Sequence, residues 1–142
     1  MLIHIEPFSC FTEALIILGN CSSTTYDNVK NEITTPGFYT WPYLYGTNKA
    51  CQWNVHEIDG NRIKLVFENF ELEAKNCKHD YLNIFDGSAS KAKQIGGRLC
   101  GAKKPNSIVS SGNKLHLQWR SDDSHVFRGF KIQCITIGKY LF

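Results

Sequence analysis

The amino-acid sequence predicts an all-β fold, an antiparallel sandwich or barrel. Several short segments alternate apolar and polar residues with a period of two, and turn residues separate them. Aromatic residues make up 13% of the chain and no long run of Ala, Leu, Glu and Lys occurs, which favours strands over helices. At 142 residues, the chain has room for one domain with one hydrophobic core.

Residues 1–20 match no standard targeting segment. They contain no Lys or Arg, and Glu13 interrupts their apolar stretch, whereas a signal peptide has a basic start and an uninterrupted apolar segment. The apolar run 14–18 is also far shorter than the roughly 20 residues that cross a bilayer. We expect residues 1–20 to be either a poor signal peptide or the remnant of a longer upstream chain.

The next segments are loops followed by a strand. Residues 21–50 are rich in Thr, Asn, Tyr and Gly, with prolines as turn markers, and we expect loops and extended segments there. In the strand that follows, Cys51, Trp53 and Val55 share one face. The pair Asp59-Gly60 then predicts a hairpin turn.

Four further segments are predicted strands. In three of them apolar residues alternate along the strand: Ile63, Leu65 and Phe67; Leu115, Leu117 and Trp119; and Phe130, Ile132 and Cys134. The fourth is 81–85, closed by the turn Asp86-Gly87. We expect no helix of useful length and no internal repeat.

Residues 88–104 differ from the rest because they hold five basic residues and no acid. These are Lys91, Lys93, Arg98, Lys103 and Lys104. A solvated loop is the simpler interpretation. The alternative is a surface for a sulfated, heparin-like glycan, which Lys and Arg bind by charge.

The cysteines favour disulfides over a metal centre. There are six, at Cys10, Cys21, Cys51, Cys77, Cys100 and Cys134. No pair has Cys-x-x-Cys spacing, so we expect no structural zinc site, and the wide spacing indicates an oxidising compartment. Composition assigns no connectivity. Because Cys134 shares a face with Phe130 and Ile132, we expect a buried, inert thiol there rather than a bridge to Cys10.

Residues 70–87 hold the strongest functional signal. An apolar strand runs into a short turn, Cys77 follows, and Asp80 opens the next strand, so Glu73 and Asp80 flank one turn. The later turn 121–124 offers further oxygens. Converging carboxylates repel one another unless a cation separates them, and Ca²⁺ prefers oxygen ligands. We interpret this stretch as half of a calcium site.

Composition and motifs exclude several other classes. Hydrophobic residues at 42% and charged residues at 20% are typical of a folded domain rather than a disordered one. A formal net charge of +3 does not by itself indicate nucleic-acid binding. No Gly-x-Ser-x-Gly or His-Glu-x-x-His motif occurs, and we expect no enzyme.

Together these segments resemble the CUB domain, an extracellular β-sandwich module. The matching segments, in the family's order, are Thr35-Pro36-Gly37-Phe38, Cys51-Gln52-Trp53, Phe70-Glu71-Leu72-Glu73, Cys77-x-x-Asp80-Tyr81-Leu82, Phe85-Asp86-Gly87, Arg98-Leu99-Cys100-Gly101, Ser110-Ser111-Gly112-Asn113-x-Leu115, Ser121-Asp122-x-Ser124 and Gly129-Phe130. The resemblance implies a jelly-roll-like sandwich of two five-stranded sheets and a domain at 21–138 with a tail at 139–142. It also implies the disulfides Cys21–Cys51 and Cys77–Cys100.

In the family's calcium-binding subset, the metal is held by an acid after the strand that precedes the cysteine, by the Asp of Asp-Tyr and by the Ser-Asp-x-Ser turn. The matching positions here are Glu73, Asp80, Asp122, the carbonyl of Asp123, and Ser124. The resemblance implies that a partner lysine docks on the rim formed by Glu73, Asp80 and Asp122, near an aromatic residue matched by Tyr45. In this sequence the turn before Cys77 is one residue shorter than in many relatives, and His125 stands where Asn is frequent.

The resemblance therefore predicts a secreted, non-enzymatic module that binds an extracellular protein with calcium as its cofactor. Two alternatives stay open. One is a domain that binds heparin-like glycans through the basic loop 88–104. The other is a fragment of a larger extracellular protease or receptor that contains CUB domains.

Overall fold

Each of the five segments that the sequence predicts to be a strand forms one. The structure is a computed structural model, and it describes residues 10–18, 32–89 and 91–138. The five strands are β3 (Ala50–His56), β4 (Arg62–Glu71), β5 (Tyr81–Asp86), β8 (Lys114–Arg120) and β9 (Gly129–Ile137). The others are β1 (Phe11–Leu18), β2 (Glu32–Thr34), β6 (Lys93–Gln94) and β7 (Ile108–Val109). One 3-10 turn, η2, spans Lys75–Cys77.

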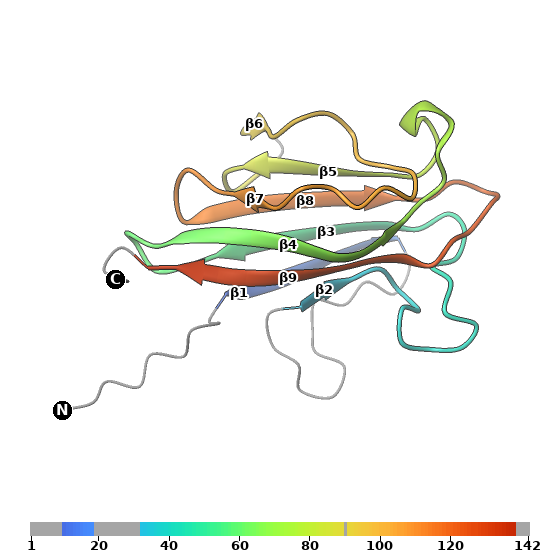
Figure 1. Cartoon of the computed structure of the whole chain (residues 1–142), viewed down its shortest axis with the longest axis horizontal. Helices are drawn as coiled ribbons and strands as arrows, with labels where there is room; N and C mark the ends of the chain where they lie inside the picture. Colours follow the sequence, from blue (N-terminus) through green and yellow to red (C-terminus); the bar gives the residue numbers. More distant parts are fainter. Residues whose placement is uncertain (1–9, 19–31, 90, 139–142) are drawn as a thin grey trace.

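The strands form two antiparallel sheets (Figure 1). The first has the order β1-β3-β8-β5-β6, and the second has the order β2-β9-β4-β7. The predicted all-β antiparallel sandwich is confirmed. Within the described residues the second sheet has four strands rather than the expected five. No described helix is long and apolar enough to cross a membrane.

The hydrophobic core lies between the sheets because alternation turns one face of each strand inward. Trp53 and Trp119 of the first sheet lie edge-on to Phe130 of the second, with ring centroids 5.9 and 6.3 Å apart. All three side chains are buried. Burying an aromatic ring such as that of Phe130 stabilises the fold by about 1.5–3 kcal/mol.

The turn at Asp59-Gly60 is not a hairpin, so this prediction is wrong. β3 before it belongs to the first sheet, and β4 after it belongs to the second. Gly60 has a φ of 92°, which glycine adopts readily, so the turn itself is where the sequence predicts it. The chain uses this turn to cross between the sheets.

Cys134 is not the free thiol that the sequence predicts. It forms a disulfide with Cys10, whose Cα atom lies 6.0 Å away. Cys10 directly precedes β1 of the first sheet, and Cys134 lies in β9 of the second, so this bond links the two sheets. Both residues are buried. Their separation of 124 residues is why the strand pattern around Cys134 does not reveal the bond.

The predicted Cys77–Cys100 disulfide is confirmed. Cys51 is also disulfide-bonded, and its predicted partner, Cys21, lies outside the described residues.

β1 lies before the domain boundary predicted at residue 21. It pairs with β3 in antiparallel register, with Thr12 opposite Val55 and Ile16 opposite Cys51. The division of the chain into a segment 1–20, a domain 21–138 and a tail 139–142 stays a prediction. The tail and residues 1–9 lie outside the described residues.

Candidate calcium-binding site

Strand pairing brings Asp80 beside Asp122. Tyr81, the first residue of β5, pairs with Arg120, the last residue of β8, so the residues just beyond them meet at one end of the sheet. The Asp122 amide donates a hydrogen bond to Asp80 Oδ1 at 2.8 Å. This contact follows from the register of the first sheet.

The second sheet delivers Glu73 to the same end. β4 ends at Glu71, and the next amide, that of Leu72, donates to the Gly101 carbonyl at 2.9 Å. Cys100, the neighbour of Gly101, is bonded to Cys77, so the disulfide ties the loop that carries Glu73 and Asp80 to the segment at Cys100. Lys75, Asn76 and Cys77 all have positive φ. Such non-glycine residues cost on the order of 1–3 kcal/mol each, so the surrounding contacts must hold this turn.

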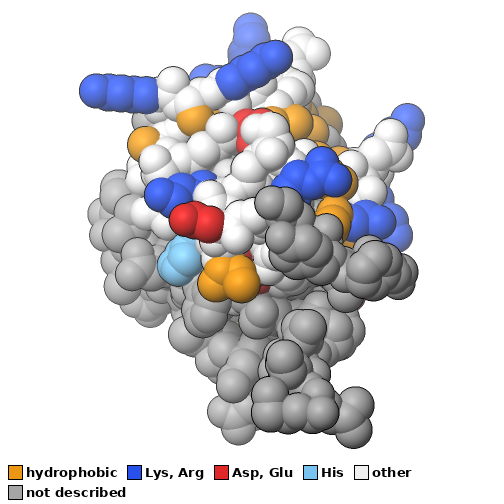
Figure 2. Space-filling model, turned by 90° about the vertical axis from the view of Figure 1, so that its left-hand side faces the viewer, with side chains coloured by type: hydrophobic (Ala, Val, Ile, Leu, Met, Phe, Trp, Pro, Cys, Tyr) orange, Lys and Arg blue, Asp and Glu red, His pale blue; other side chains and the backbone are white. Residues whose placement is uncertain are grey.

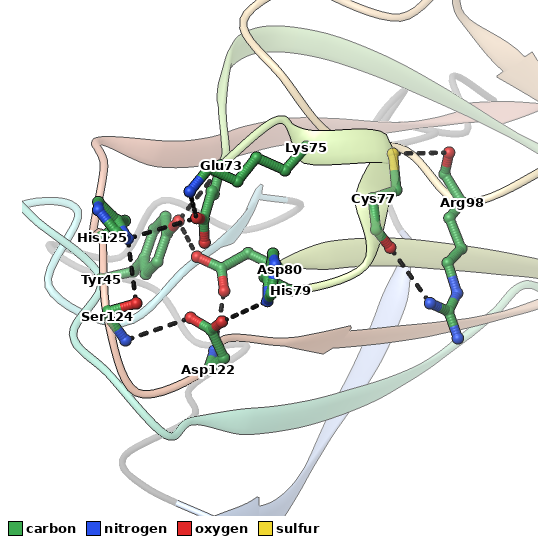
Figure 3. Close-up of polar contacts among 10 residues, drawn as sticks. All are labelled: Tyr45, Glu73, Lys75, Cys77, His79, Asp80, Arg98, Asp122, Ser124 and His125. Carbon is green, nitrogen blue, oxygen red and sulfur yellow. Dashed lines mark hydrogen bonds and ion pairs between the residues drawn. The ribbon is translucent and has the colours of Figure 1, made fainter.

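Three carboxylates converge where these loops meet (Figure 3). One oxygen from each of Glu73, Asp80 and Asp122 lies within 4.8 Å of the other two. Glu73 and Asp80 are 4% and 0% exposed, and Glu73 Oε2 is buried with no hydrogen-bond partner among the described residues. A buried carboxylate oxygen without a partner is costly, and an all-oxygen set is what Ca²⁺ binds. The residues therefore fit a calcium ion.

Tyr45 lies beneath the carboxylates and supports Asp80. Its ring packs edge-on to Trp119, with centroids 5.2 Å apart, and its side chain is buried. Its hydroxyl donates to Asp80 Oδ2 and accepts a hydrogen bond from the Glu73 amide at 3.4 Å. Burial, followed by the hydrogen bond to Asp80, raises the pKa of Tyr45. The predicted partner-contacting Tyr45 thus points inward and positions Asp80.

The surroundings of Asp80 disfavour its charged form. Burial raises its pKa most, and the neighbouring charges of Asp122 and Glu73 raise it further. The hydrogen bonds from the Tyr45 hydroxyl and the Asp122 amide oppose these effects, and the pKa of Asp80 stays above its usual range. A cation at this position favours the charged form.

Three basic side chains lie beside the carboxylates of Glu73 and Asp122. His79 Nδ1 lies 2.8 Å from Asp122 Oδ2, and His125 Nδ1 lies 3.4 Å from Glu73 Oε1. Lys75 Nζ lies 4.0 Å from the same Glu73 oxygen. His79 and Lys75 are not among the residues predicted from the sequence, although both lie in the loop between Glu73 and Asp80. That position in the loop is the sequence signal that would have found them.

The turn after Asp122 holds the two remaining predicted ligands. Asp123 and Ser124 are exposed. The Ser124 amide donates to Asp122 Oδ1 at 3.2 Å, and Ser124 Oγ lies 3.0 Å from His125 Nδ1. Ser124 thus supports Asp122 through its backbone. The ligand roles of the Asp123 carbonyl and of Ser124 Oγ stay predictions.

The loop between β2 and β3 holds the turn after β8 in place. Ser121 Oγ donates to the Gly46 carbonyl at 2.9 Å and accepts from the Lys49 amide at 3.1 Å. The Asn48 amide donates to the Asp122 carbonyl at 2.8 Å. Three loops, following β2, β4 and β8, therefore build one site.

The basic residues of 88–104 do not converge. Lys93 pairs in register with Asp86, the last residue of β5, whereas the Arg98 guanidinium lies 3.9 Å from the ring centroid of Tyr81, the first residue. Lys91, Lys103 and Lys104 are exposed. Figure 2 shows one end of the molecule, where Lys and Arg side chains are spread among uncharged side chains and a few acidic ones. This arrangement favours a solvated surface, and glycan binding stays a prediction.

Comparisons with known proteins agree with the fold. The family model described as "CUB domain" matches residues 21–134. Tolloid-like protein 1 from Homo sapiens is 42% identical over 100 residues, which are 70% of this chain and 10% of that protein. Procollagen C-endopeptidase enhancer 1 from Rattus norvegicus is 33% identical over 99 residues, 69% of this chain and 20% of that protein. The chain thus spans about a tenth to a fifth of the length of these relatives.

Solved structures share the sandwich. The MASP-1 CUB2 domain bound to Ca²⁺ has a TM-score of 0.62 and 28% identity, and it covers 73% of this chain and 89% of that one. The CUB1-EGF-CUB2 region of human MASP-1/3 has a TM-score of 0.63 and 28% identity, over 75% of this chain and 41% of that one. The family model matches most of this chain, and the two-sheet fold agrees with that match. This chain therefore belongs to the CUB domain family.

Proposed function

We propose that this chain is a secreted, calcium-dependent protein-binding module whose acidic rim, formed by Glu73, Asp80 and Asp122, accepts a lysine of a partner protein. CUB domains are non-catalytic modules of extracellular proteins, which supports a binding role outside the cell. The observation that carries the proposal is the group of three carboxylates within 4.8 Å, in which the buried Oε2 of Glu73 has no hydrogen-bond partner in the described part of the chain. The similar MASP-1 CUB2 domain bound to Ca²⁺ adds support.

Bound calcium would supply positive charge to this cluster in addition to that of the neighbouring Lys75. Glu73, Asp80 and Asp122 would hold it through their carboxylates, and Asp123 and Ser124 would contribute the further predicted oxygens. Tyr45 keeps Asp80 oriented toward the other acids.

The partner lysine has one accessible carboxylate to approach. The Asp122 side chain is 25% exposed, whereas that of Glu73 is 5% exposed. A lysine therefore reaches the rim at Asp122. An exposed lysine–carboxylate contact is worth only about 0–1 kcal/mol, so one domain binds weakly and linked copies supply avidity.

Thermal unfolding in calcium and in chelator tests the metal site. Calcium that binds only the folded state stabilises it by about 2.7 kcal/mol at a hundredfold excess over Kd. We expect calcium to raise the melting temperature of the native chain and Asp122→Ala to remove most of that rise while the Cys77–Cys100 disulfide still forms. Asp123→Asn, which keeps the main-chain carbonyl, is the matched control. Equal melting temperatures of the native chain in calcium and in chelator would contradict the proposal.

A further inference from the structure

An exposed run of apolar side chains, residues 41–44, lies in the loop between β2 and β3; we name it the apolar tip. Trp41 is 80% exposed, Tyr43 44% and Leu44 40%. The remaining exposed large hydrophobic residues of the described chain, Ile58 and Val109, stand singly. Soluble domains rarely group apolar side chains on their surface, and Trp and Tyr are enriched among residues that dominate binding energy. The tip therefore has the composition of a contact surface.

Hydrogen bonds within the loop hold the tip in shape. The Thr40 amide donates to the Gly37 carbonyl at 3.2 Å, and the Tyr43 amide donates to the Thr40 carbonyl at 2.7 Å. A Cβ atom on Gly37 would lie 2.6 Å from the Leu44 carbonyl oxygen, so the two ends of the loop touch. A surface ordered before binding loses little conformational freedom when a partner docks.

Arg128 fixes the tip to the connection that carries Asp122. Its guanidinium lies 4.2 Å from the ring centroid of Phe38 and 5.4 Å from that of Tyr43, and its Nη1 donates to the Phe38 carbonyl at 2.8 Å. Phe38 is buried beneath the loop. Arg128 lies between β8 and β9, in the same connection as Asp122.

The tip and the acidic rim are close enough to meet one partner. Trp41 precedes Tyr45 by four residues, a distance of at most about 14 Å even in a fully extended chain. Tyr45 in turn donates its hydroxyl hydrogen to Asp80. Figure 1 shows the connections after β2, β4 and β8 gathered at one end of the sandwich.

We infer that the apolar tip and the acidic rim form one composite surface, whose partner is a protein segment with a lysine flanked by apolar side chains. The inference rests on the proposed function and names the partner's chemistry. The negative charge of the acidic rim favours such a partner over a membrane or a second copy of this chain. The rim repels anionic lipid headgroups, and a symmetric contact between two copies brings like rims together. The lysine of the partner segment pairs with the carboxylates of the rim, and the apolar residues beside that lysine cover Trp41.

The test uses displayed peptides with one fixed lysine between randomised positions. They are selected on the complete, oxidised chain in millimolar calcium, and we expect apolar residues beside the lysine in the binders. Trp41→Ser should weaken their binding at least tenfold with an unchanged melting temperature. The matched control is Ile58→Ser, because Ile58 is 65% exposed and lies at the opposite end of β3. The Ile58→Ser variant should bind the selected peptides as tightly as the native chain does.

Tryptophan fluorescence reports directly on the tip. The chain has three tryptophans, and Trp53 and Trp119 are 0% and 1% exposed, so acrylamide quenches mainly Trp41. Bound peptide should shield Trp41 and reduce the quenching. In Trp41→Phe, the remaining fluorescence should resist acrylamide with or without peptide.

The outcomes separate this inference from the proposed function. Peptide binding that needs calcium and the peptide lysine but survives Trp41→Ser overturns the composite surface and leaves the proposed function intact. Binding that persists in chelator, or after the peptide lysine becomes Met, overturns both. Self-association in sedimentation velocity, or binding to phosphatidylserine vesicles, that Trp41→Ser abolishes would assign the tip to another occupant and also overturn the inference.

Discussion

Glu73 and Asp80 share one hydroxyl, that of Tyr45. The hydroxyl accepts a hydrogen bond from the Glu73 amide and donates one to the Asp80 carboxylate. Because the Tyr45 ring packs against Trp119, this one side chain orients both acidic residues of the loop. Asp122 completes the group from the other side through its amide. The site is thus assembled from buried polar contacts that depend on the aromatic core below it.

The raised pKa of Asp80 predicts a pH dependence of stability in chelator. Because this pKa is above its ordinary value of 3.8 in the folded protein, the folded state holds the proton more tightly than the unfolded state. Stability should therefore fall as pH rises from about 3.8 through the raised pKa. Asp80→Asn removes this titration, so its free energy of unfolding relative to the native chain should improve across that window. Urea unfolding at a series of pH values measures this difference in the free energy of unfolding. Profiles of the variant and the native chain that stay parallel with pH would contradict the prediction.

At the scale of elements, the connection between β4 and β5 carries two of the three acids in a short, strained turn. Three consecutive positive φ values reverse the chain without a glycine. The Cys77–Cys100 disulfide joins this turn to the segment after β6, and Arg98 Nη1 adds a hydrogen bond to the Cys77 carbonyl at 3.1 Å. The disulfide therefore holds the geometry of the site as well as the fold.

Removing that disulfide should weaken calcium binding more than it disturbs the sheets. Its cysteines are 23 residues apart, and the chain-entropy argument gives a stabilisation of about 3–4 kcal/mol for a loop of this size. In Cys77→Ser/Cys100→Ser we expect this loss in chemical unfolding and a calcium affinity at least tenfold lower by calorimetric titration. Cys10→Ser/Cys134→Ser is the control for disulfide loss away from the site. Unchanged calcium affinity in the first variant would show that the turn holds its shape alone.

At the scale of the whole molecule, β1 and the Cys10–Cys134 disulfide link the start of the described chain to its last strand. β1 adds an edge to the first sheet, and the disulfide ties that edge to the second sheet. In Figure 1, β1 lies alongside β3. β1 and Cys10, which make these contacts, precede the domain boundary predicted at residue 21.

A chain that begins at residue 21 tests the contribution of β1. It lacks both the pairing with β3 and the disulfide, whose loop of 124 residues corresponds to about 5 kcal/mol in the chain-entropy argument. We expect a lower midpoint in urea and one reactive thiol, Cys134, after denaturation. Cys10→Ser in the complete chain separates the loss of the disulfide from the loss of the strand. A shortened chain as stable as the complete one would place the boundary at residue 21 after all.

The sequence by itself determined five of the nine described strands and which of their faces is apolar. Side chains alternate across a strand, so a period of two is a local property that needs no knowledge of neighbours. Cys51, Trp53 and Val55 are buried as predicted. The family resemblance also pointed to Glu73, Asp80 and Asp122, which the structure brings together.

Only the tertiary structure decided which segments meet. A local pattern does not state to which sheet the strand after Asp59-Gly60 belongs, or that Cys134 meets a cysteine 124 residues earlier. His116 lies between Leu115 and Leu117, on the other face of its strand, yet it is 4% exposed because it packs on Phe85 and pairs with Asn54 on neighbouring strands. These outcomes depend on contacts between distant residues, which only packing of the whole chain selects.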